Sequence, residues 1–496
     1  MSFFRSLQLV VVGLILCSST VQAYEITPVL VSGDPVPAPA TGMVGFAAAP
    51  VARGGNLMLT GSTVGAFVWV NGAIAYQQGD FDPSGSGFQL GFPATLEPST
   101  SRITSTGEAL VATTLLGGNF DRVAYIWDGS GLTLVARTGN PIPGASGQAY
   151  GDMSFFGLTD SGTFCCKTVL QPLGDTALLR GGTILQQVGT TIVGGGSFDS
   201  QIWTNDFDLV EWNGAGDVVF LGQGNGAAST DEAIFRVLNS TNSLELLVGE
   251  GDSVTPLTGP NPDSVNSFEC TSIASTGDWA VFVKLASQPA ASSDAIVTAA
   301  GLVFQAGLPA GSGTGGTIGA IDSCSINAVG DLVVIASIEN ATDPDITQGL
   351  FLNGTLILRN SLFLVANQFV ALSNAIIDDT GTIYFEAFNG VTGGQGVYSL
   401  TPEFIRGDTN GDGSNNVADA VYLLGNLFPG VNQNELHCLD AADANNDCSI
   451  NIADAVIILN SLFGSPAVPL PVPNPTTGCG PDTGCSLGCA VPTPSC

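Results

Sequence analysis

Basic residues are scarce in this chain of 496 residues. Eleven lysines and arginines stand against 43 aspartates and glutamates, which gives a formal net charge of −32. Only two of the eleven are lysines, Lys167 and Lys284. A surface this acidic repels phosphate backbones and anionic membrane surfaces, so no nucleic acid is expected as a partner. Divalent cations are the natural counter-charge, although solubility in a salty medium explains much of the acidity equally well.

Histidine occurs once, at His437, which excludes a Ser-His-Asp arrangement in the first 400 residues. The chain also lacks a His-Glu-x-x-His motif and a phosphate-binding glycine–lysine loop. Paired carboxylates can hydrolyse glycosidic bonds without histidine. One local cluster qualifies: Asp199, Asp206, Asp208 and Glu211. Carboxylates at this density are more often turn or surface residues, so we favour a region without catalytic residues.

Long hydrophobic runs are missing after the first residues. Residues 1–23 have the pattern of a signal peptide, in which Arg5 precedes a short apolar stretch over residues 7–17 and a small-residue cleavage site at residues 21–23. The stretch is too short to span a bilayer comfortably, and no later one is long and apolar enough. The mature chain is therefore predicted to be secreted, extracellular or at the cell surface, and not membrane-spanning.

Cleavage would remove Cys17 and leave ten of the eleven cysteines, an even number that predicts disulfides in an exported protein. Cys165 and Cys166 are neighbours on an apparent strand, so their side chains should point to opposite faces. A proline-rich tail, residues 467–496, is expected to form a stiff, extended linker that ends in a small knot. Four cysteines crowd its end: Cys479, Cys485, Cys489 and Cys496.

Residues 24–402 carry a repeat of short alternating strands separated by glycine turns, with no sustained helical periodicity. A polar turn that ends in glycine and leads into an apolar strand recurs seven times, at Gly55, Gly107, Gly162, Gly216, Gly277, Gly330 and Gly381. With about four strands, each unit must stack on its neighbours to bury its faces. Radial stacking of four-stranded units predicts a mainly β fold, a seven-bladed β-propeller. A β-solenoid or a pair of sandwiches is the alternative.

The two ends of this region complement each other. The seventh unit stops at "GVYSL", residues 396–400, without its last strand, whereas "ITPVLVSGDPVP", residues 26–37, is a strand without a unit. We expect the first strand to complete the last blade and close the ring.

These units resemble the tandem repeats of secreted bacterial proteins that carry an Asn-x-x-Gly-x-x-Ala-Phe signature. The nearest match begins at Asn213 and ends at Phe220, with Val219 in place of the alanine. A second begins at Asn327 and keeps the asparagine and the glycine. The resemblance implies an architecture and no chemistry.

The C-terminal part is duplicated with a constant offset of 35 residues, because Asp408 corresponds to Asp443 and Asp419 to Asp454. In each copy oxygen-bearing side chains occupy loop positions one, three, five, nine and twelve, and a serine stands at position seven, where the main-chain carbonyl points inward. Hard oxygen donors at this spacing surround Ca²⁺. The predicted ligands are Asp408, Asn410, Asp412, Ser414, Asn416 and Asp419 for one ion, and Asp443, Asn445, Asp447, Ser449, Asn451 and Asp454 for a second.

A helix with one apolar stripe follows each loop, and the two stripes are expected to be buried face to face. The predicted stripes are Ala420, Leu423, Leu424, Leu427 and Phe428, and Ala455, Ile458, Leu459, Leu462 and Phe463.

Aspartate at position twelve and a strand-like approach to Asp408 distinguish these loops from an EF-hand. With the tandem copy, they make residues 403–466 resemble a type I dockerin, a small helical module of paired calcium loops. The resemblance implies one Ca²⁺ per loop and a cohesin-like or other protein partner. It also implies a role in extracellular polysaccharide degradation, and such C-terminal ends are similar to those of secreted planctomycete proteins.

The chain departs from the dockerin pattern at two places. Cys448 replaces the glycine expected at position six, and we expect it to form a disulfide with Cys438. Positions ten and eleven, which help dockerins to select a cohesin, are plain and apolar: Val417-Ala418 and Ile452-Ala453.

The chain is thus predicted to comprise a signal peptide (residues 1–23), a propeller (24–402), a dockerin-like domain (403–466) and a cysteine-rich tail (467–496). The predicted function is that of a secreted calcium-binding protein, a non-catalytic binding or scaffold component of polysaccharide degradation. A glycoside hydrolase with a carboxylate pair in the propeller is one alternative. A cell-surface adhesion or cell-envelope component is another.

Overall fold

The structure is a computed structural model that describes most of the chain. The described residues are 24–36, 43–63, 65–93, 102–117, 121–227, 230–259, 262–311, 314–361, 363–364, 367–428, 436, 438–447 and 449–480. The predicted signal peptide, His437, Cys448 and residues 481–496 lie outside them.

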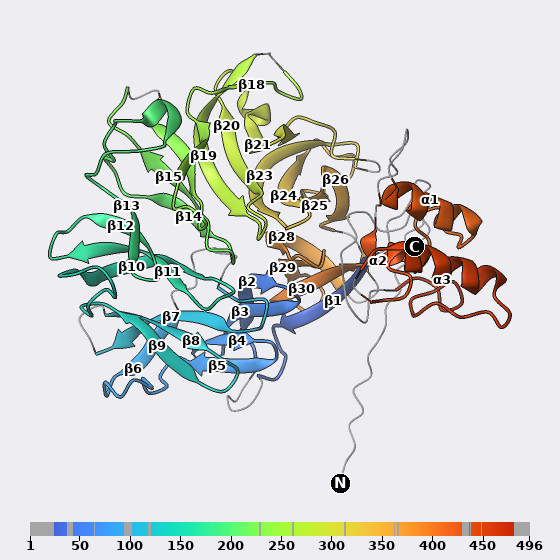
Figure 1. Ribbon diagram of the computed structural model, residues 1–496, viewed down its shortest axis with the longest axis horizontal. Helices are drawn as coiled ribbons and strands as arrows, with labels where there is room; N and C mark the ends of the chain where they lie inside the picture. The colour runs from blue at the N-terminus through green and yellow to red at the C-terminus, as the bar shows by residue number, and fades with distance from the viewer. Residues whose placement is uncertain are drawn as a thin grey trace, which may run out of the picture.

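Seven antiparallel sheets are arranged around a common centre, which confirms the predicted seven-bladed β-propeller (Figure 1). The first three blades follow one another along the chain. Their strands are β2 (Phe46–Arg53), β3 (Asn56–Ser62), β4 (Ala66–Val70) and β5 (Ala73–Gln77); β6 (Gln89–Pro93), β7 (Ala109–Leu116), β8 (Arg122–Trp127) and β9 (Leu132–Arg137); and β10 (Ala149–Leu158), β11 (Phe164–Gln171), β12 (Thr176–Arg180) and β13 (Thr183–Gln187).

The next three blades continue in the same order around the ring. Blade 4 holds β14 (Asp208–Trp212), β15 (Val218–Gln223), β16 (Glu232–Val237) and β17 (Leu244–Gly249), preceded by the short helix η1 (Gly196–Phe198). Blade 5 holds β18 (Ser253–Val254), β19 (Asp263–Ile273), β20 (Trp279–Leu285), β21 (Asp294–Thr298) and β22 (Gly301–Gln305), with η2 (Ala290–Ser292). Blade 6 holds β23 (Thr317–Ile326), β24 (Leu332–Glu339), β25 (Gln348–Leu352) and β26 (Thr355–Arg359).

Blade 7 contains strands from both ends of the propeller sequence. Its order is β1 (Tyr24–Val31), β30 (Gly394–Pro402), β29 (Ile383–Asn389), β28 (Asn367–Ile377) and β27 (Phe363–Leu364). β1 runs antiparallel to β30, from Tyr24 opposite Pro402 to Val31 opposite Gly396. The predicted closure by the first strand is therefore confirmed: β1 is the end strand of blade 7 and joins the two ends of the propeller sequence in one sheet.

The seven repeated glycines lie in the turn between the first two long strands of each blade. All of them have a positive φ, between 77° and 92°, which a residue with a side chain rarely adopts. In blades 1 and 3 to 7 the long strand that leads into this turn contacts the equivalent strand of a neighbouring blade; these strands are β2, β10, β14, β19, β23 and β28. The repeat seen in the sequence therefore marks the turns at one end of the propeller axis.

Turns from blades that are not neighbours also meet at this end. Arg53 of blade 1 forms a 3.1 Å ion pair with Asp160 of blade 3. A Cβ atom added to Gly214 of blade 4 would lie 2.0 Å from the Arg53 guanidinium carbon, so a larger residue there would displace this guanidinium. On the other side, Ser275 of blade 5 donates a 3.0 Å hydrogen bond to Asp379 of blade 7.

The described propeller cysteines are free thiols, so the disulfides predicted for them are not formed: Cys165, Cys166, Cys270 and Cys324. The expectation for Cys165 and Cys166 is confirmed, since they pack into different clusters on the two faces of β11. Both are fully buried among apolar side chains.

Three helices lie beside blade 7 in Figure 1: α1 (Val417–Leu427), α2 (Leu439–Ala442) and α3 (Ile452–Phe463). None of the helices in the described part of the chain is long and apolar enough to cross a membrane.

Ring closure predicts a large difference between two substitutions in β1. Leu30 is buried, and its replacement by alanine should lower the free energy of unfolding by about 2–4 kcal/mol, because it leaves a cavity at the closing strand. Thr27 is exposed in the same strand, so Thr27→Ala should change the free energy of unfolding by less than about 0.5 kcal/mol. Urea unfolding of the two variants measures the difference, and equal effects would contradict a closing role for β1.

Candidate metal centre

The two predicted calcium loops fold alike, and each leads directly into its helix. Asn416 precedes α1 and accepts a hydrogen bond from the Ala418 N–H, while the Asp419 side chain accepts one from the Asn416 N–H. Asn451 and Asp454 form the same capping box before α3. Loop positions nine and twelve are thus also the N-cap and third residues of a helix, which explains why the sequence places an asparagine and an aspartate there.

The carboxylates at positions one and twelve are buried in both loops. Asp408, Asp419, Asp443 and Asp454 are each at most 1% exposed. Main-chain N–H groups hold them: Asp408 accepts hydrogen bonds from Asp412 and Gly413, and Asp419 accepts one from Asn410. Among the described residues, no lysine or arginine forms a salt bridge with Asp408, Asp419 or Asp454. Buried negative charge without a cationic partner fits a site for a hard cation.

The outer positions of the loops are more accessible. Asp412 and Asp447, at position five, are exposed. In the first loop the Asn410 amide donates a 3.0 Å hydrogen bond to Asp412, and in the second the Asn445 amide donates a 2.8 Å bond to Asp447. The carbonyl oxygens at position seven also have equivalent partners, since Ser414 accepts from the Asn416 amide at 3.2 Å and Ser449 from the Asn451 amide at 3.1 Å.

All twelve predicted ligands therefore lie in two equivalent loops. No group of three or more His, Cys, Asp or Glu side chains within the described ranges is gathered closely enough to hold a metal ion. The predicted donors also include two asparagine amide oxygens and one main-chain oxygen per loop. A Ca²⁺ ion would have to replace the bonds between positions three and five and draw these oxygens inward.

Burial and neighbouring carboxylates raise the pKa values of aspartates in the loops. Burial raises the pKa of Asp408 from 3.8 to about 6, and the nearby carboxylates of Asp419 and Asp412 raise it too, against the opposing N–H groups of Gly413 and Asp412. Burial also raises the pKa of Asp419 and Asp454 above the ordinary value. The ionised loop is therefore a costly state that a bound cation would relieve.

The helices pack as predicted over most of their stripes. Ala420 and Leu423 of α1 meet Ala455 and Ile458 of α3 in one buried cluster. The prediction that Phe428 and Phe463 are buried is wrong, since they are 63% and 71% exposed. Phe428 is the C-cap of α1 and Phe463 the last residue of α3, so both lie at the ends of the helices.

Arg406 is a residue of this module that the sequence did not single out. It is fully buried and donates hydrogen bonds to the main-chain oxygens of Asp440, at 2.9 Å, and Asp443. It precedes the first loop by two residues and contacts the first position of the second, so it connects the two loops. The sequence feature that could have identified it is its place directly before Gly407-Asp408, in a chain with few basic residues.

The expectation of a stiff, extended linker after α3 is wrong for the described part of the tail. Leu470 is buried in the same cluster as the two helices. Pro473 accepts a hydrogen bond from the Arg406 N–H, and Gly480 pairs with Phe404. The tail folds back because the helices bury Leu470 and because its main chain forms hydrogen bonds with the main chain of Phe404 and Arg406. Cys438 and Cys479 each take part in a disulfide. Cys448, the partner predicted for Cys438, lies outside the described residues, so that pairing stays a prediction.

Three of the four acidic residues considered for glycoside hydrolysis form ion pairs or hydrogen bonds within the fold. Lys167 forms ion pairs with Asp206 at 3.0 Å and with Asp208 at 3.8 Å. Asp199 accepts a hydrogen bond from the Gly195 N–H in its own turn. Glu211 is buried on β14. Asp199, Asp206 and Asp208 thus have partners within the fold.

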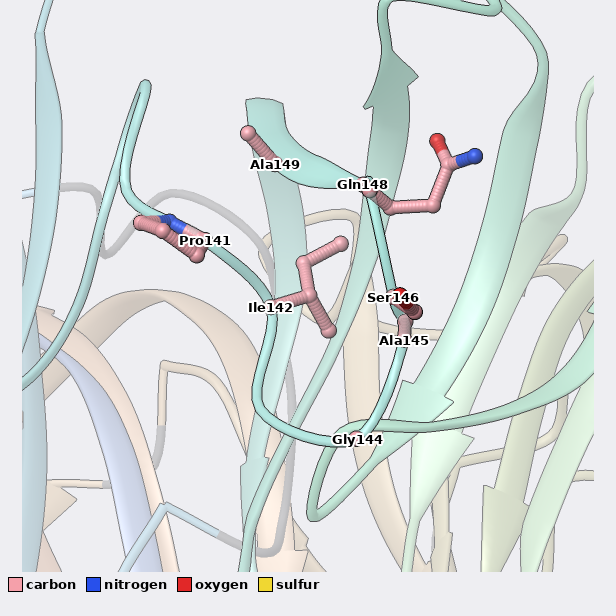
Figure 2. A pocket seen from close by; sticks show the side chains of 8 residues that line it. Pro141, Ile142, Gly144, Ala145, Ser146, Gln148 and Ala149 are labelled. Atoms are coloured by element: carbon pink, nitrogen blue, oxygen red, sulfur yellow. The ribbon is translucent and has the colours of Figure 1, made fainter.

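A hollow of about 550 Å³ lies at the loop before β10, lined by residues 141, 142 and 144–149. Figure 2 shows Ile142 pointing into the space that the loop encloses, whereas Gln148 points away from it. The lining contains no acidic, basic or histidine side chain, so it offers no group for acid–base chemistry.

Comparison with known proteins identifies a family for the propeller. The model of a family of unknown function (DUF7453) matches residues 93–352. No curated protein matches the chain.

Several solved structures are similar at low identity. The Dos1 propeller is 10% identical, with 72% of this chain and 79% of that one covered and a TM-score of 0.35. The extracellular domains 1–2 of Drosophila Semaphorin 1a are 12% identical, with coverage of 75% and 88% and a TM-score of 0.35. Acylaminoacyl peptidase from Pyrococcus horikoshii is 10% identical, with coverage of 69% and 49% and a TM-score of 0.39, so this chain spans about half of its length. At this identity none of them indicates what this chain binds.

The raised pKa of Asp408 predicts how the calcium-free module responds to pH. Between pH 3.8 and about 6 the folded carboxyl keeps a proton that the unfolded one loses, so stability is greatest below this range and falls as pH rises through it. Thermal unfolding of the full chain in EDTA, followed by helical circular dichroism, measures the trend. The slope should flatten in Asp408→Asn, whereas a module whose stability rises from pH 4 to pH 6 would contradict the assignment.

Proposed function

The chain belongs to this family of unknown function, and we propose that it is a secreted calcium-binding protein whose propeller is held to a protein partner through a dockerin-like module. The propeller acts as a non-catalytic binding or scaffold unit. Each loop binds one Ca²⁺ ion through the predicted ligands, and the ion stabilises the pair of helices that contacts the partner. The dockerin resemblance associates the protein with extracellular polysaccharide degradation.

The observation that carries the proposal is the burial of carboxylates at equivalent positions of two loops. Asp408 and Asp419 in the first loop, and Asp454 in the second, are buried with main-chain N–H groups and no salt-bridge partner among the described residues. Burying a carboxylate without compensation costs several kcal/mol in ordinary cases. Calcium favours carboxylate, amide and carbonyl oxygens, which is the donor set that these loops offer.

A second observation supports docking through the helices. Six large apolar side chains on or directly beside α1 and α3 are exposed by 49–71%: Val417, Val421 and Phe428 in the first copy, and Ile452, Val456 and Phe463 in the second. Each residue is 35 positions from its counterpart. We call these six residues the duplicated apolar patch. Single exposed apolar residues are common on protein surfaces, whereas groups of them are typical of a protein interface. Here the group occurs at equivalent positions of both copies.

The pattern of charges and apolar groups supports a protein partner over a lipid or a nucleic acid. The net charge of −32 repels anionic surfaces. The duplicated apolar patch instead suits an apolar recess of a folded partner, and its first members are the position-ten residues through which dockerins select cohesins.

Calorimetric titration of the purified full chain with Ca²⁺ tests the metal sites. We expect two ions per chain, and one ion after Asp419→Ala or Asp454→Ala, because each substitution removes a ligand and a helix-capping carboxylate from one loop. Asp345→Ala removes an exposed acidic residue of the propeller and should still bind two ions. No binding heat in the wild type, together with helicity that is indifferent to EDTA, would overturn the proposal.

Affinity capture from the culture medium of the producing organism tests docking. The immobilised full chain should retain a partner in calcium and release it in EDTA. Val421→Asp combined with Val456→Asp should reduce capture at least tenfold, because two charges in the duplicated apolar patch cost more than about 1.4 kcal/mol of binding. Val391→Asp places the same charge at an exposed apolar position of the propeller and should capture normally. Equal capture by the two variants would show that the patch is not the interface.

A further inference from the structure

Two cysteines face each other across the boundary between blades 5 and 6. Cys270 lies on β19 and Cys324 on β23. The Cys324 thiol donates a hydrogen bond to the Cys270 sulfur, and the two sulfur atoms are 3.6 Å apart. They are 54 residues apart, the same offset as Ser272 and Ile326, whose hydrogen bond connects the same two strands. The repeat offset between these blades is 53 residues, from Gly277 to Gly330, so the two thiols face each other from adjacent positions of the repeat.

The surrounding contacts fix the two strands relative to each other. The Ser272 hydroxyl accepts a 3.1 Å hydrogen bond from the Ile326 N–H. On the far side of β19, Thr271 donates a 2.6 Å hydrogen bond to the main-chain oxygen of Leu209 in blade 4. A disulfide requires the sulfur atoms to approach by about a further 1.5 Å, which side-chain rotation can provide on strands already held at this spacing.

The two thiols differ in access and in acidity. Cys270 is half-buried, whereas Cys324 is buried. The hydrogen bond from Cys324 lowers the pKa of Cys270, and the same bond together with burial raises the pKa of Cys324. Since the thiolate is the nucleophile in thiol–disulfide exchange, Cys270 is the thiol that reacts first.

We propose that Cys270 and Cys324 form a reversible disulfide that joins blades 5 and 6 when the protein meets a small-molecule disulfide. The Cys270 thiolate attacks one sulfur of the reagent and displaces a thiolate, which leaves a mixed disulfide on Cys270. Cys324 then loses its proton and attacks the Cys270 sulfur, which releases the second thiolate. Two cysteine thiols are oxidised, and the reagent is reduced to two thiols.

The cross-link would add a covalent bond between blades 5 and 6, which hydrogen bonds and packing otherwise hold together. It connects strands of adjacent blades, where the polypeptide loop it closes contains three strands of blade 5. A cross-link of this kind restricts the unfolded chain and hinders opening between these two blades. Cys165 and Cys166 offer no alternative, since both are fully buried in separate clusters.

The test uses the purified full chain and oxidised glutathione. After incubation, exposed thiols are alkylated, and a non-reducing digest is analysed by mass spectrometry. We expect one new linked peptide pair, through Cys270 and Cys324, that is absent before incubation, with Cys165 and Cys166 alkylated only after denaturation. Recovery of Cys270 and Cys324 as separately alkylated residues, or as two separate glutathione adducts, would overturn the proposal.

Single variants test the order of the two steps. Cys324→Ser should leave a stable glutathione adduct on Cys270, because the resolving thiol is gone, and Cys270→Ser should leave Cys324 unmodified. Oxidation should raise the midpoint of thermal unfolding of the wild type by several degrees and leave that of Cys324→Ser unchanged. An adduct on Cys324 in the Cys270→Ser variant, or equal thermal shifts in both proteins, would refute the mechanism. The peptide analysis of the wild type decides the cross-link even if a variant fails to fold.

Discussion

The pairing of β1 with β30 is the constraint on which the rest of the structure depends. Tyr24 lies opposite Pro402, so hydrogen bonds between the two ends of the propeller sequence close the ring. Contacts at the axis depend on this closure: Arg53 reaches Asp160 across one intervening blade, and Ser275 reaches Asp379 in the same way. An open arrangement would move these turns apart. Closure and the contacts at the axis therefore stabilise the same state, and each strengthens the other.

The fold could be predicted from the sequence because its signals are local. A turn that requires positive φ selects glycine whatever surrounds it, and all seven such glycines have that conformation. Contacts between distant residues left no such pattern. The absence of a side chain at Gly214 leaves room for the Arg53 guanidinium from another blade. The repeat pattern does not predict this contact, because it joins blades that are far apart in the sequence. The cysteine count predicted disulfides, but whether two propeller thiols meet depends on how the blades pack. Among the cysteines that the structure describes in the propeller, Cys270 and Cys324 are the pair joined by a hydrogen bond.

In the candidate site, too, local features could be predicted from the sequence and contacts between distant residues could not. The capping boxes at Asn416 and Asn451 involve residues within one turn, so the loops and the starts of the helices could be located from their spacing. The prolines after Gly464 favour extended chain locally. That preference did not predict the burial of Leu470, since the contact depends on helices that precede it in the chain. Arg406 was missed because its partners are main-chain oxygens, which every residue carries.

The helical module inverts the usual distribution of polar and apolar groups. Aspartates lie inside, while valine, isoleucine and phenylalanine lie on the surface, and both inversions occur twice at a spacing of 35 residues. Each inversion is unfavourable in an isolated module, the first through desolvation and the second through hydration of apolar surface. A cation inside the loops and a protein on the helices would remove one cost each. In the assembly that we propose, a cation would also stabilise the helix starts, so binding of the ion would favour binding of the partner.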